Sequence, residues 1–403
     1  MCIFCEVAPG DEAHGAVSDA DALAAEACCL RAGRRVPATI LTGFLGAGKT
    51  TLLNELLRGC AGKRVAVLQN EFGGVAIDDL LVARGAFLDV AVTTLASGCV
   101  CCTVRGDLVE GLKRLAEDDG GGFDAVFVET SGLSDVAPVC QTFWADRFVL
   151  RNFELDAVVA VVDAAHAPAL LGGRPADGGD GDGDDGEADD TQRHEAPAPR
   201  GPTDDDDPLR VAAARLLCEQ LCMADVVVLS KVDVATPAQR ADTAALVRRV
   251  NATADVVDGG RGAVPLARVL GVRAFALGRA LEARRLADVC RPAVPGGFKG
   301  RRHAHEAFGS VGLECDAPLD ELSFHDWLEA VVAKHAARLY RAKGVVFFRG
   351  VDGATAVHCV GAHVEAERLA GDAARDGASR LVFIGRTRGI EAELRAGFLV
   401  TTR

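Results

Sequence analysis

Short, mostly apolar runs occur at intervals in the first two thirds of the chain. They occupy residues 36–42, 65–68, 125–128, 157–162 and 226–229. Runs of this length without alternation are typical of strands that are buried on both faces, as in a parallel sheet. None approaches the roughly 18 apolar residues that a membrane-spanning helix requires, so we expect no membrane association.

Stretches with a helical spacing of apolar residues lie between these runs. Residues 51–57, 108–115 and 209–221 repeat apolar side chains at intervals of three and four positions. Strands and helices therefore alternate along the chain. This alternation predicts an α/β fold with a doubly wound, mainly parallel sheet.

The pattern changes in the last quarter of the chain. Residues 324–332 have the periodicity of an amphipathic helix, whereas residues 344–348, 356–360 and 380–385 have strand character. We therefore expect a smaller C-terminal α+β domain at residues 305–403.

Two segments show neither pattern. Residues 1–35 are rich in Ala, Asp, Glu and Cys, and we expect a flexible N-terminal extension. Residues 172–208 consist mainly of Gly, Asp, Pro and Ala and contain no Phe, Tyr or Trp. Such a segment cannot bury enough apolar surface to offset its ordering entropy, which predicts a disordered acidic insertion. The larger domain is then expected at residues 36–293.

Charge and cysteine content narrow the function classes. The formal net charge of −14 is largely local, because residues 177–207 carry 13 acidic and 2 basic side chains. No basic, aromatic-rich stretch indicates a nucleic-acid partner. The absence of a targeting peptide makes the cytoplasm the expected location, where the 14 cysteines are mostly free thiols. Six of them lie among apolar neighbours and are expected to be small buried side chains: Cys60, Cys140, Cys218, Cys222, Cys290 and Cys359.

A complete phosphate-binding loop lies between the first apolar run and the first helical stretch. In such loops glycines allow successive backbone N–H groups to surround phosphate oxygens at a helix N-terminus. We expect Lys49 to contact the β- and γ-phosphates of a nucleotide and the Thr50 hydroxyl to bind Mg²⁺. The predicted nucleotide-binding residues of this loop are Gly43, Gly46, Ala47, Gly48, Lys49, Thr50 and Thr51.

Two further segments follow buried strands. Glu129 can orient the Mg²⁺ shell or the attacking water, and the N–H of Gly132 can contact the γ-phosphate, although Glu129 can also be an ordinary strand-end carboxylate. Ser230, Lys231 and Asp233 belong to a Ser-Lys-Val-Asp segment. A carboxylate at Asp233 can accept both hydrogen bonds from the N1–H and 2-amino edge of guanine, and adenine offers no such pair. Guanine is therefore favoured over adenine.

Three thiols occur within four residues, at Cys99, Cys101 and Cys102. In a turn or at a helix start they can converge on one ion, and tetrahedral Zn²⁺ is bound well by thiolates. Three sulfurs leave a fourth position open for Glu71, Asp78, a water molecule or a recipient, which suits transfer of the metal. Cu⁺ and Co²⁺ remain alternatives, and so do buried or redox-active thiols without a metal.

Taken together, these motifs resemble the CobW family of P-loop GTPases, within the metallochaperone group. The resemblance extends from residue 36 to 403 without the acidic insertion, and the cysteine motif beside a phosphate loop is its most specific part. The matching segments are residues 43–51, 70–73, 98–102, 129–132, 161–164, 219–220, 224–225, 230–233, 340–344 and 381–386.

The resemblance implies GTP hydrolysis with Mg²⁺, coupled to the handling of Zn²⁺ or a similar ion, and a CobW C-terminal domain. Lys49 and Glu129 are then the expected catalytic residues, the partner is a metal-dependent client protein, and a homodimer is compatible with the sequence. Two departures stand out. Gly74 occupies a position where the family usually has glutamate, and Asn251–Ala252 lacks a proline that the family often has near the guanine pocket.

The resulting hypothesis is a GTP-dependent metallochaperone in which nucleotide state controls the thiolate site. GTP would order the loops at residues 70–79 and 129–132, and loss of the γ-phosphate would release them. A zinc buffer or sensor with a vestigial GTPase and a cobalt chaperone for cobalamin synthesis are alternatives. A small-molecule kinase is a further alternative, against which residues 230–233 argue.

Overall fold

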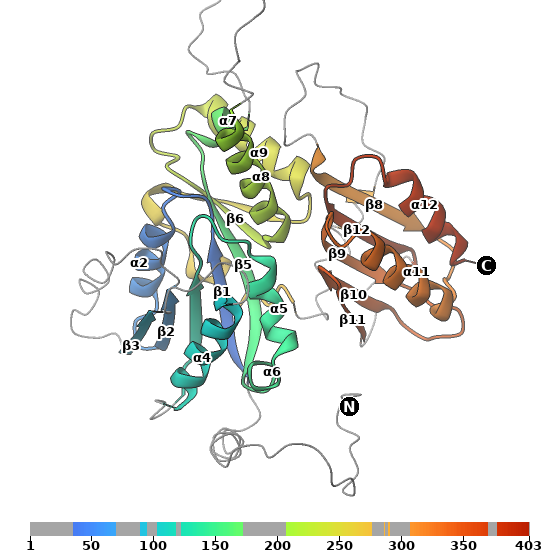
Figure 1. The fold of residues 1–403 in the computed structure, drawn as a ribbon, viewed down its shortest axis with the longest axis horizontal. Coiled ribbons are helices and arrows are strands. Elements are labelled where there is room, and N and C mark those ends of the chain that lie inside the picture. Colours follow the sequence, from blue (N-terminus) through green and yellow to red (C-terminus); the bar gives the residue numbers. More distant parts are fainter. Residues whose placement is uncertain are drawn as a thin grey trace, which may run out of the picture.

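The computed structural model describes residues 35–69, 89–94, 103–117, 122–171, 207–275, 286, 289–290, 307–369 and 377–402. These residues form two sheets, each with helices packed against it (Figure 1). The predicted extension at residues 1–35 and the insertion at 172–208 lie outside the described residues, apart from Arg35, Asp207 and Pro208.

In the described part of the chain, the larger sheet has seven parallel strands in the order β3-β2-β4-β1-β5-β6-β7. The chain places β2, β3 and β4 on one side of β1 and β5, β6 and β7 on the other. This confirms the predicted doubly wound parallel sheet and places the carboxyl ends of all strands along one edge. The strands are β1 (Val36–Thr42), β2 (Arg64–Gln69), β3 (Asp89–Thr94), β4 (Ala125–Glu129), β5 (Phe153–Asp163), β6 (Val226–Ser230) and β7 (Asp255–Gly259).

Both faces of this sheet are buried, as the continuous apolar runs predict. Along β5, Val158 and Ala160 pack on one side of the sheet and Val159 and Val161 on the other. Helices α4, α5, α6, α8 and α9 cover the first side and α2 covers the second (Figure 1). The helices are α2 (Lys49–Gly59), α4 (Thr103–Glu117), α5 (Ala137–Ala145), α6 (Arg147–Asn152), α7 (Ala167–Leu170), α8 (Pro208–Met223) and α9 (Pro237–Val250).

Local sequence explains where two of these helices begin. The side chain of Asp207 accepts a hydrogen bond from the backbone N–H of Leu209, and Pro208 opens α8. Thr236 and Gln239 form a reciprocal capping box at the start of α9. None of the helices in the described part of the chain has the length and hydropathy needed to span a bilayer.

The C-terminal residues form a five-stranded antiparallel sheet in the order β11-β10-β9-β12-β8. Helices α11 and α12 pack on one face around a core that includes Phe324, Phe383 and Phe398. This confirms the predicted α+β character, and the predicted helix at 324–332 lies within α11. The elements are β8 (Gly309–Cys315), α11 (Glu321–Lys334), β9 (Leu339–Val346), β10 (Thr355–Val360), β11 (His363–Arg368), β12 (Ser379–Gly385) and α12 (Glu391–Val400).

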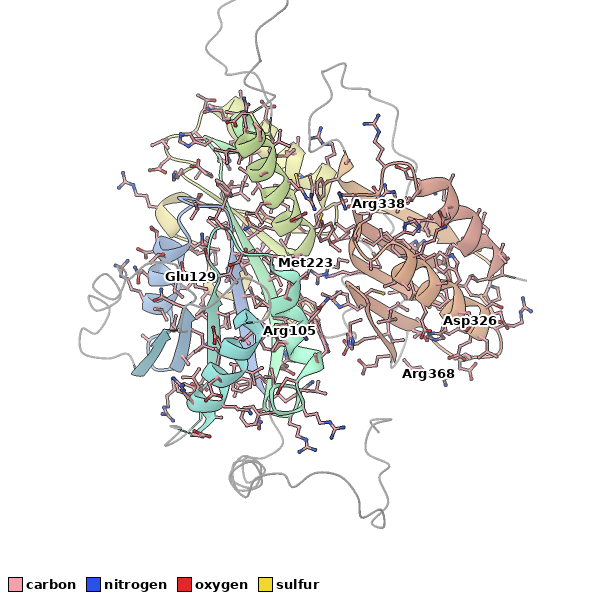
Figure 2. The ribbon with its side chains drawn as sticks, viewed as in Figure 1. Arg105, Glu129, Met223, Asp326, Arg338 and Arg368 are labelled. Atoms are coloured by element: carbon pink, nitrogen blue, oxygen red, sulfur yellow. The ribbon has the colours of Figure 1, made fainter. Side chains whose placement is uncertain are left out.

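The other face of the C-terminal sheet packs against the larger domain, and a buried ionic cluster lies between them. Asp225, which follows α8, is 2.5 Å from Arg341 Nη2 and 3.0 Å from Lys343 Nζ. Arg341 also donates to the carbonyl oxygen of Met223, which lies where the two domains meet (Figure 2). Burial raises the pKa of Asp225, but the two cations outweigh it, so the pKa lies below its ordinary value. Because separating the domains would leave buried charges without partners, these ion pairs hold the two domains in contact.

Candidate nucleotide and metal site

The phosphate-binding loop follows β1 at the carboxyl edge of the larger sheet. Gly43, Gly46 and Gly48 have φ angles of 141°, 72° and 96°, a region that favours glycine. A Cβ atom on Gly43 would lie 2.3 Å from the carbonyl oxygen of Val161, so only glycine fits between β1 and β5 at this point. The loop ends where α2 begins, at Lys49, and a helix N-terminus favours an anionic ligand.

The ammonium group of Lys49 is held against this loop. Its Nζ donates to the carbonyl oxygens of Gly43 at 2.8 Å and Phe44 at 3.3 Å. Burial lowers the pKa of Lys49, and the nearby carboxylate of Glu129 opposes this only in part. Because an anion would relieve the cost of burying this cation, phosphate oxygens are stronger partners for Nζ than the two carbonyls.

Glu129, at the end of β4, is the central carboxylate of the site (Figure 2). It is 7% exposed, and its Oε1 accepts a hydrogen bond of 2.9 Å from Thr50 Oγ1. Its Oε2 accepts a hydrogen bond of 2.8 Å from Nε2 of Gln69 at the end of β2. Adjacent hydroxyl and carboxylate oxygens are the ligands and second-sphere partners that Mg²⁺ prefers, so the residues present fit that ion.

The loop after β4 lies against the phosphate-binding loop. A Cβ atom on Gly132 would lie 2.7 Å from the backbone nitrogen of Leu45, so the two loops touch at a position where only glycine fits. The carbonyl oxygen of Gly132 accepts a hydrogen bond of 3.2 Å from Gln220 Nε2, which belongs to α8. Gly132 is therefore placed beside the phosphate-binding loop, as its proposed contact with a γ-phosphate requires.

The segment after β6 also contacts the phosphate-binding loop. Ser230 Oγ lies 2.6 Å from the carbonyl oxygen of Ala47 and 3.2 Å from that of Val162, which fastens the loop to β6. Lys231, with φ of 54°, places its Nζ 2.7 Å from Oδ2 of Asp163 at the end of β5. Burial raises the pKa of Asp163, but hydrogen bonds from Lys231 and His166 outweigh it and lower the pKa below its ordinary value.

Asp233 follows Lys231 by two residues, in the loop after β6. Its side chain is 39% exposed, and its Oδ2 lies 3.4 Å from Arg261 Nε. Arg261 belongs to the turn that follows β7, so the loops after β6 and β7 meet here. The carboxylate of Asp233 is thus partly accessible at the carboxyl edge of the sheet.

Thr51 and the cysteine motif complete the predicted residues. Thr51 lies in the first turn of α2 with an exposed side chain. Cys99, Cys101 and Cys102 lie outside the described residues, as do Glu71 and Asp78. Within the described ranges, no three His, Cys, Asp or Glu side chains form a metal-binding group.

The described residues on either side of the cysteine motif limit where it can lie. β3 ends at Thr94, which is paired with Gln69, and Gln69 is paired with Glu129. With strands about 4.8 Å apart, the backbone of Thr94 lies roughly 10 Å from that of Glu129. Cys99 is five positions after Thr94, a distance that an extended chain spans in at most about 18 Å. The described chain resumes at Thr103, the first residue of α4.

Comparison with known proteins places these features in a family. Residues 37–258 match the family described as CobW/HypB/UreG, nucleotide-binding domain. The Cobalamin synthesis protein cobW C-terminal domain matches residues 308–400. The chain belongs to the CobW family.

Similar proteins extend over nearly the whole chain. A zinc chaperone CobW from Sinorhizobium sp is 31% identical over 90% of this chain and 96% of its own length. The zinc chaperone YjiA of Escherichia coli is 29% identical over 78% of this chain and 83% of its own. The crystal structure of Zn(II)-bound YjiA GTPase superposes with a TM-score of 0.63 at 25% identity, covering 91% of this chain and 99% of that one.

One expectation drawn from the CobW family is corrected by the structure. Asn251 is buried and donates from Nδ2 to the carbonyl oxygens of Leu221 and Ala224, each at 2.8 Å. These residues precede β6, whereas Ser230 ends it. Asn251 therefore lies at the opposite edge of the sheet from the predicted guanine pocket, where it joins α8 to α9.

Other expectations are confirmed or extended. The six cysteines predicted as small buried side chains are buried: Cys60, Cys140, Cys218, Cys222, Cys290 and Cys359. The structure adds Gln69, Asp163, Gln220 and Arg261 to the surroundings of the site. Asp163 and Gln220 lie in segments that resemble the family, but no local motif marks Gln69 or Arg261.

Proposed function

We propose that this protein is a GTP-hydrolysing metallochaperone that binds Zn²⁺ through Cys99, Cys101 and Cys102 and delivers it to a metal-dependent client. Membership of the CobW family and the printed names of its relatives support the zinc assignment. The observation that carries the proposal is the hydrogen bond between Thr50 and Glu129 at the carboxyl edge of the larger sheet. β3, the strand that precedes the cysteines in the sequence, ends at the same edge. The proposal assigns residues 36–293 to the GTPase domain, residues 305–403 to the CobW C-terminal domain, and the cytoplasm as location.

Nucleotide binding is assigned to the loop that contains Gly43 and Lys49. The triphosphate would replace the two carbonyl oxygens that Lys49 now contacts, which neutralises a partly desolvated cation. Thr50, with Glu129 behind it, would hold Mg²⁺, which supplies charge neutralisation to the phosphates when bound. Ala47 would stay fixed through its carbonyl oxygen, which Ser230 holds.

Hydrolysis is assigned to the same carboxylate. Glu129 is fixed by Thr50 at one oxygen and by Gln69 at the other. With both of its oxygens fixed in this way, the carboxylate of Glu129 would orient a water molecule for attack on phosphorus. Gly132, whose loop touches Leu45, would donate its backbone N–H to the γ-phosphate.

Guanine specificity is assigned to Asp233. Its carboxylate can accept from both N1–H and the 2-amino group of guanine, and an adenine would leave it without these donors. The ion pair of Lys231 with Asp163 fixes the start of the segment that carries Asp233. A strong preference for GTP over ATP should therefore be lost in Asp233→Asn, because an amide cannot accept both bonds.

Metal binding is assigned to the three thiols by their types and spacing and by the chain that flanks them. α4 begins at Thr103, one residue after Cys102, and a helix N-terminus stabilises a nearby thiolate. Thr94, which ends β3 two strands away from Glu129, precedes Cys99 by five positions in the sequence. A coupling of about 3 kcal/mol between nucleotide and metal would change zinc affinity by more than a hundredfold.

The proposal is tested by combining turnover with zinc binding. The wild-type protein should hydrolyse GTP in preference to ATP, and Lys49→Ala should abolish turnover while keeping zinc binding. Replacing Cys99, Cys101 and Cys102 together by serine should abolish zinc binding while keeping GTP binding, and Cys315→Ser, at a half-buried thiol of the C-terminal sheet, is the matched control. Zinc binding that survives the triple replacement, or equal turnover of wild type and Lys49→Ala, would reject the assignment.

A further inference from the structure

Gln220 connects α8 to the loop that carries Gly132. Its side chain is 1% exposed, and Nε2 donates to the carbonyl oxygens of Gly132 at 3.2 Å and Ser134 at 3.5 Å. Both partners are acceptors, so the amide nitrogen must face the loop. Gln220 Oε1 is consequently turned away, and this buried atom has no hydrogen-bond partner within the part of the chain that the structure describes.

A buried acceptor without a donor is costly, so a donor brought within reach of Gln220 Oε1 would be stabilised there. A second conformation of the loop, with a backbone N–H turned toward Oε1, would satisfy it. Gln220 would then hold the segment around Gly132 through Nε2 in the arrangement that the structure shows and through Oε1 in the other. The loop touches Leu45 of the phosphate-binding loop, so the choice between them depends on what occupies that loop.

The preceding residue of α8 faces the C-terminal domain. Glu219 Oε1 accepts a hydrogen bond of 2.7 Å from the hydroxyl of Tyr340 and lies 2.8 Å from Arg215 Nε. Burial raises the pKa of Asp135, in the Gly132 loop, and the charge of Glu219 adds to the rise. Glu219 and Gln220 are neighbours in α8, so this helix contacts Tyr340 of β9 through one residue and the Gly132 loop through the next.

A second contact joins the same loop to the C-terminal domain through α5, which begins at Ala137. Trp144 of α5 stacks on His363 of β11, with ring centroids 5.3 Å apart. A Cβ atom on Gly361, between β10 and β11, would lie 2.5 Å from Nε2 of Gln141 of α5. The hairpin of β10 and β11 thus rests directly on the helix that follows the loop.

We propose that Gln220 is a positioning residue for the Gly132 loop, and that Glu219 with Tyr340 transmits the state of this loop to the C-terminal domain. The inference rests on the proposed function, because it takes Gly132 as the contact of the γ-phosphate. Its consequence is that the C-terminal domain presents a different surface in the GTP and GDP states. The zinc-loaded, GTP-bound form is then the one that a client distinguishes.

Binding measurements test the positioning role. Gln220→Met is similar in volume but cannot donate hydrogen bonds to the carbonyl oxygens of Gly132 and Ser134. In this variant, affinity for a non-hydrolysable GTP analogue should fall roughly three- to tenfold. Affinity for GDP should stay within about twofold, because the contact assigned to the loop is with the γ-phosphate, which GDP lacks. A purely structural role would weaken both ligands equally, and that result would overturn the assignment. Thr355→Val, at a buried residue of β10, is the control and should alter neither affinity.

Fluorescence tests transmission. The chain has two tryptophans, so Trp327→Phe leaves Trp144 as the reporter at the interface. In that background, the GTP analogue and GDP should give different Trp144 spectra, and adding Gln220→Met or Tyr340→Phe should remove the difference. Hydrogen exchange of β9 in a protein that keeps Trp327 should show the same dependence on nucleotide.

The two proposals fail in different ways. If the analogue and GDP both bind and alter exchange at Gly132, but leave Trp144 and β9 unchanged, transmission is overturned and the GTPase assignment stands. A difference that persists in both Gln220→Met and Tyr340→Phe would also overturn this route. Failure of the wild-type protein to bind either nucleotide would reject the proposed function and this inference together.

Discussion

At the scale of single residues, the site is organised around the Glu129 carboxylate. Thr50 and Gln69 each donate to a different oxygen of Glu129, while Lys49 contacts backbone carbonyls nearby. These contacts hold the proposed catalytic groups in fixed positions relative to one another. Preorganisation of this kind lowers the free-energy cost of assembling the site during the reaction.

Replacement of Thr50 by valine tests the magnesium assignment. The change removes the hydroxyl that would bind Mg²⁺ and leaves Oε1 of Glu129 without its donor. We expect GTP affinity in the presence of Mg²⁺ to fall at least tenfold, about 1.4 kcal/mol, whereas affinity in EDTA should change little. Calorimetric titration with and without Mg²⁺ measures both quantities. A loss of equal size in EDTA would show that the hydroxyl serves the nucleotide or the fold rather than the metal.

At the scale of elements, close approach between strands fixes the phosphate-binding loop. β1 and β5 are paired in parallel, and the turn at Gly43 passes against the backbone of Val161. The site thus depends on the spacing of two strands that are more than 110 residues apart along the chain. The glycine serves this packing as well as the phosphates.

Replacement of Gly43 by alanine should therefore disrupt the loop. The added Cβ would lie 2.3 Å from the carbonyl oxygen of Val161, at a φ of 141° that alanine rarely adopts. We expect loss of nucleotide binding and a reduction in the free energy of unfolding of about 2 kcal/mol or more. Gly106→Ala is the control, because its Cβ meets no neighbour and α4 should gain about 0.5 kcal/mol. Urea unfolding compares them, and equal stabilities would contradict the packing argument.

Elements with continuous apolar runs or clear helical periodicity could be predicted from the sequence. β4 and β6 coincide with predicted runs, and α8 contains the predicted helical stretch. β8 and β11 were not predicted, because glycines interrupt the apolar pattern of β8 and β11 carries mainly polar side chains at the edge of its sheet. Edge strands commonly carry charges, which removes the signal of alternation.

The candidate site could be predicted only where its residues are neighbours in sequence. The glycines, Lys49 and Thr50 form one motif, whereas the contact of Gln69 with Glu129 depends on β2 and β4 lying side by side. Likewise, Ser230 reaches Ala47 across 183 residues. Strand order and register create these contacts, and neither follows from local patterns.

At the scale of the whole molecule, the domain interface contains a buried histidine. His358 Nε2 accepts a hydrogen bond of 3.0 Å from Arg341 Nε, and its ring stacks on Phe275. Burial lowers the pKa of His358 well below 6.5, and the charges of Arg341 and Lys343 lower it further. The interface therefore keeps this histidine neutral at ordinary pH.

Acidification should weaken the folded state through this group. Below pH 6.5 the unfolded chain binds a proton at His358 that the folded protein does not, so stability falls as pH falls from about 7 to 5. The contribution approaches about 1.4 kcal/mol per pH unit at its limit. His358→Gln keeps an acceptor for Arg341 and removes the titrating group. The free energy of unfolding of this variant should therefore fall less steeply with decreasing pH, by up to about 1.4 kcal/mol per pH unit. Urea unfolding at pH 7.5 and 5.5 measures it, and parallel curves for both proteins would contradict the account.

In the proposed function, nucleotide and metal affect each other across one edge of the larger sheet. β3, which precedes the cysteines in the sequence, and β4, which ends at Glu129, both pair with β2 and end along the same edge, where the Gly132 loop contacts the phosphate-binding loop. A difference in metal affinity between nucleotide states must be matched by an equal difference in nucleotide affinity between metal states.

The most direct test is titration of the full-length protein with Zn²⁺, once with a bound Mg²⁺–GTP analogue and once with Mg²⁺–GDP. We predict zinc affinity at least tenfold higher with the analogue and an equal gain in analogue affinity when zinc is bound. Equal zinc affinities in the two nucleotide states would contradict the account.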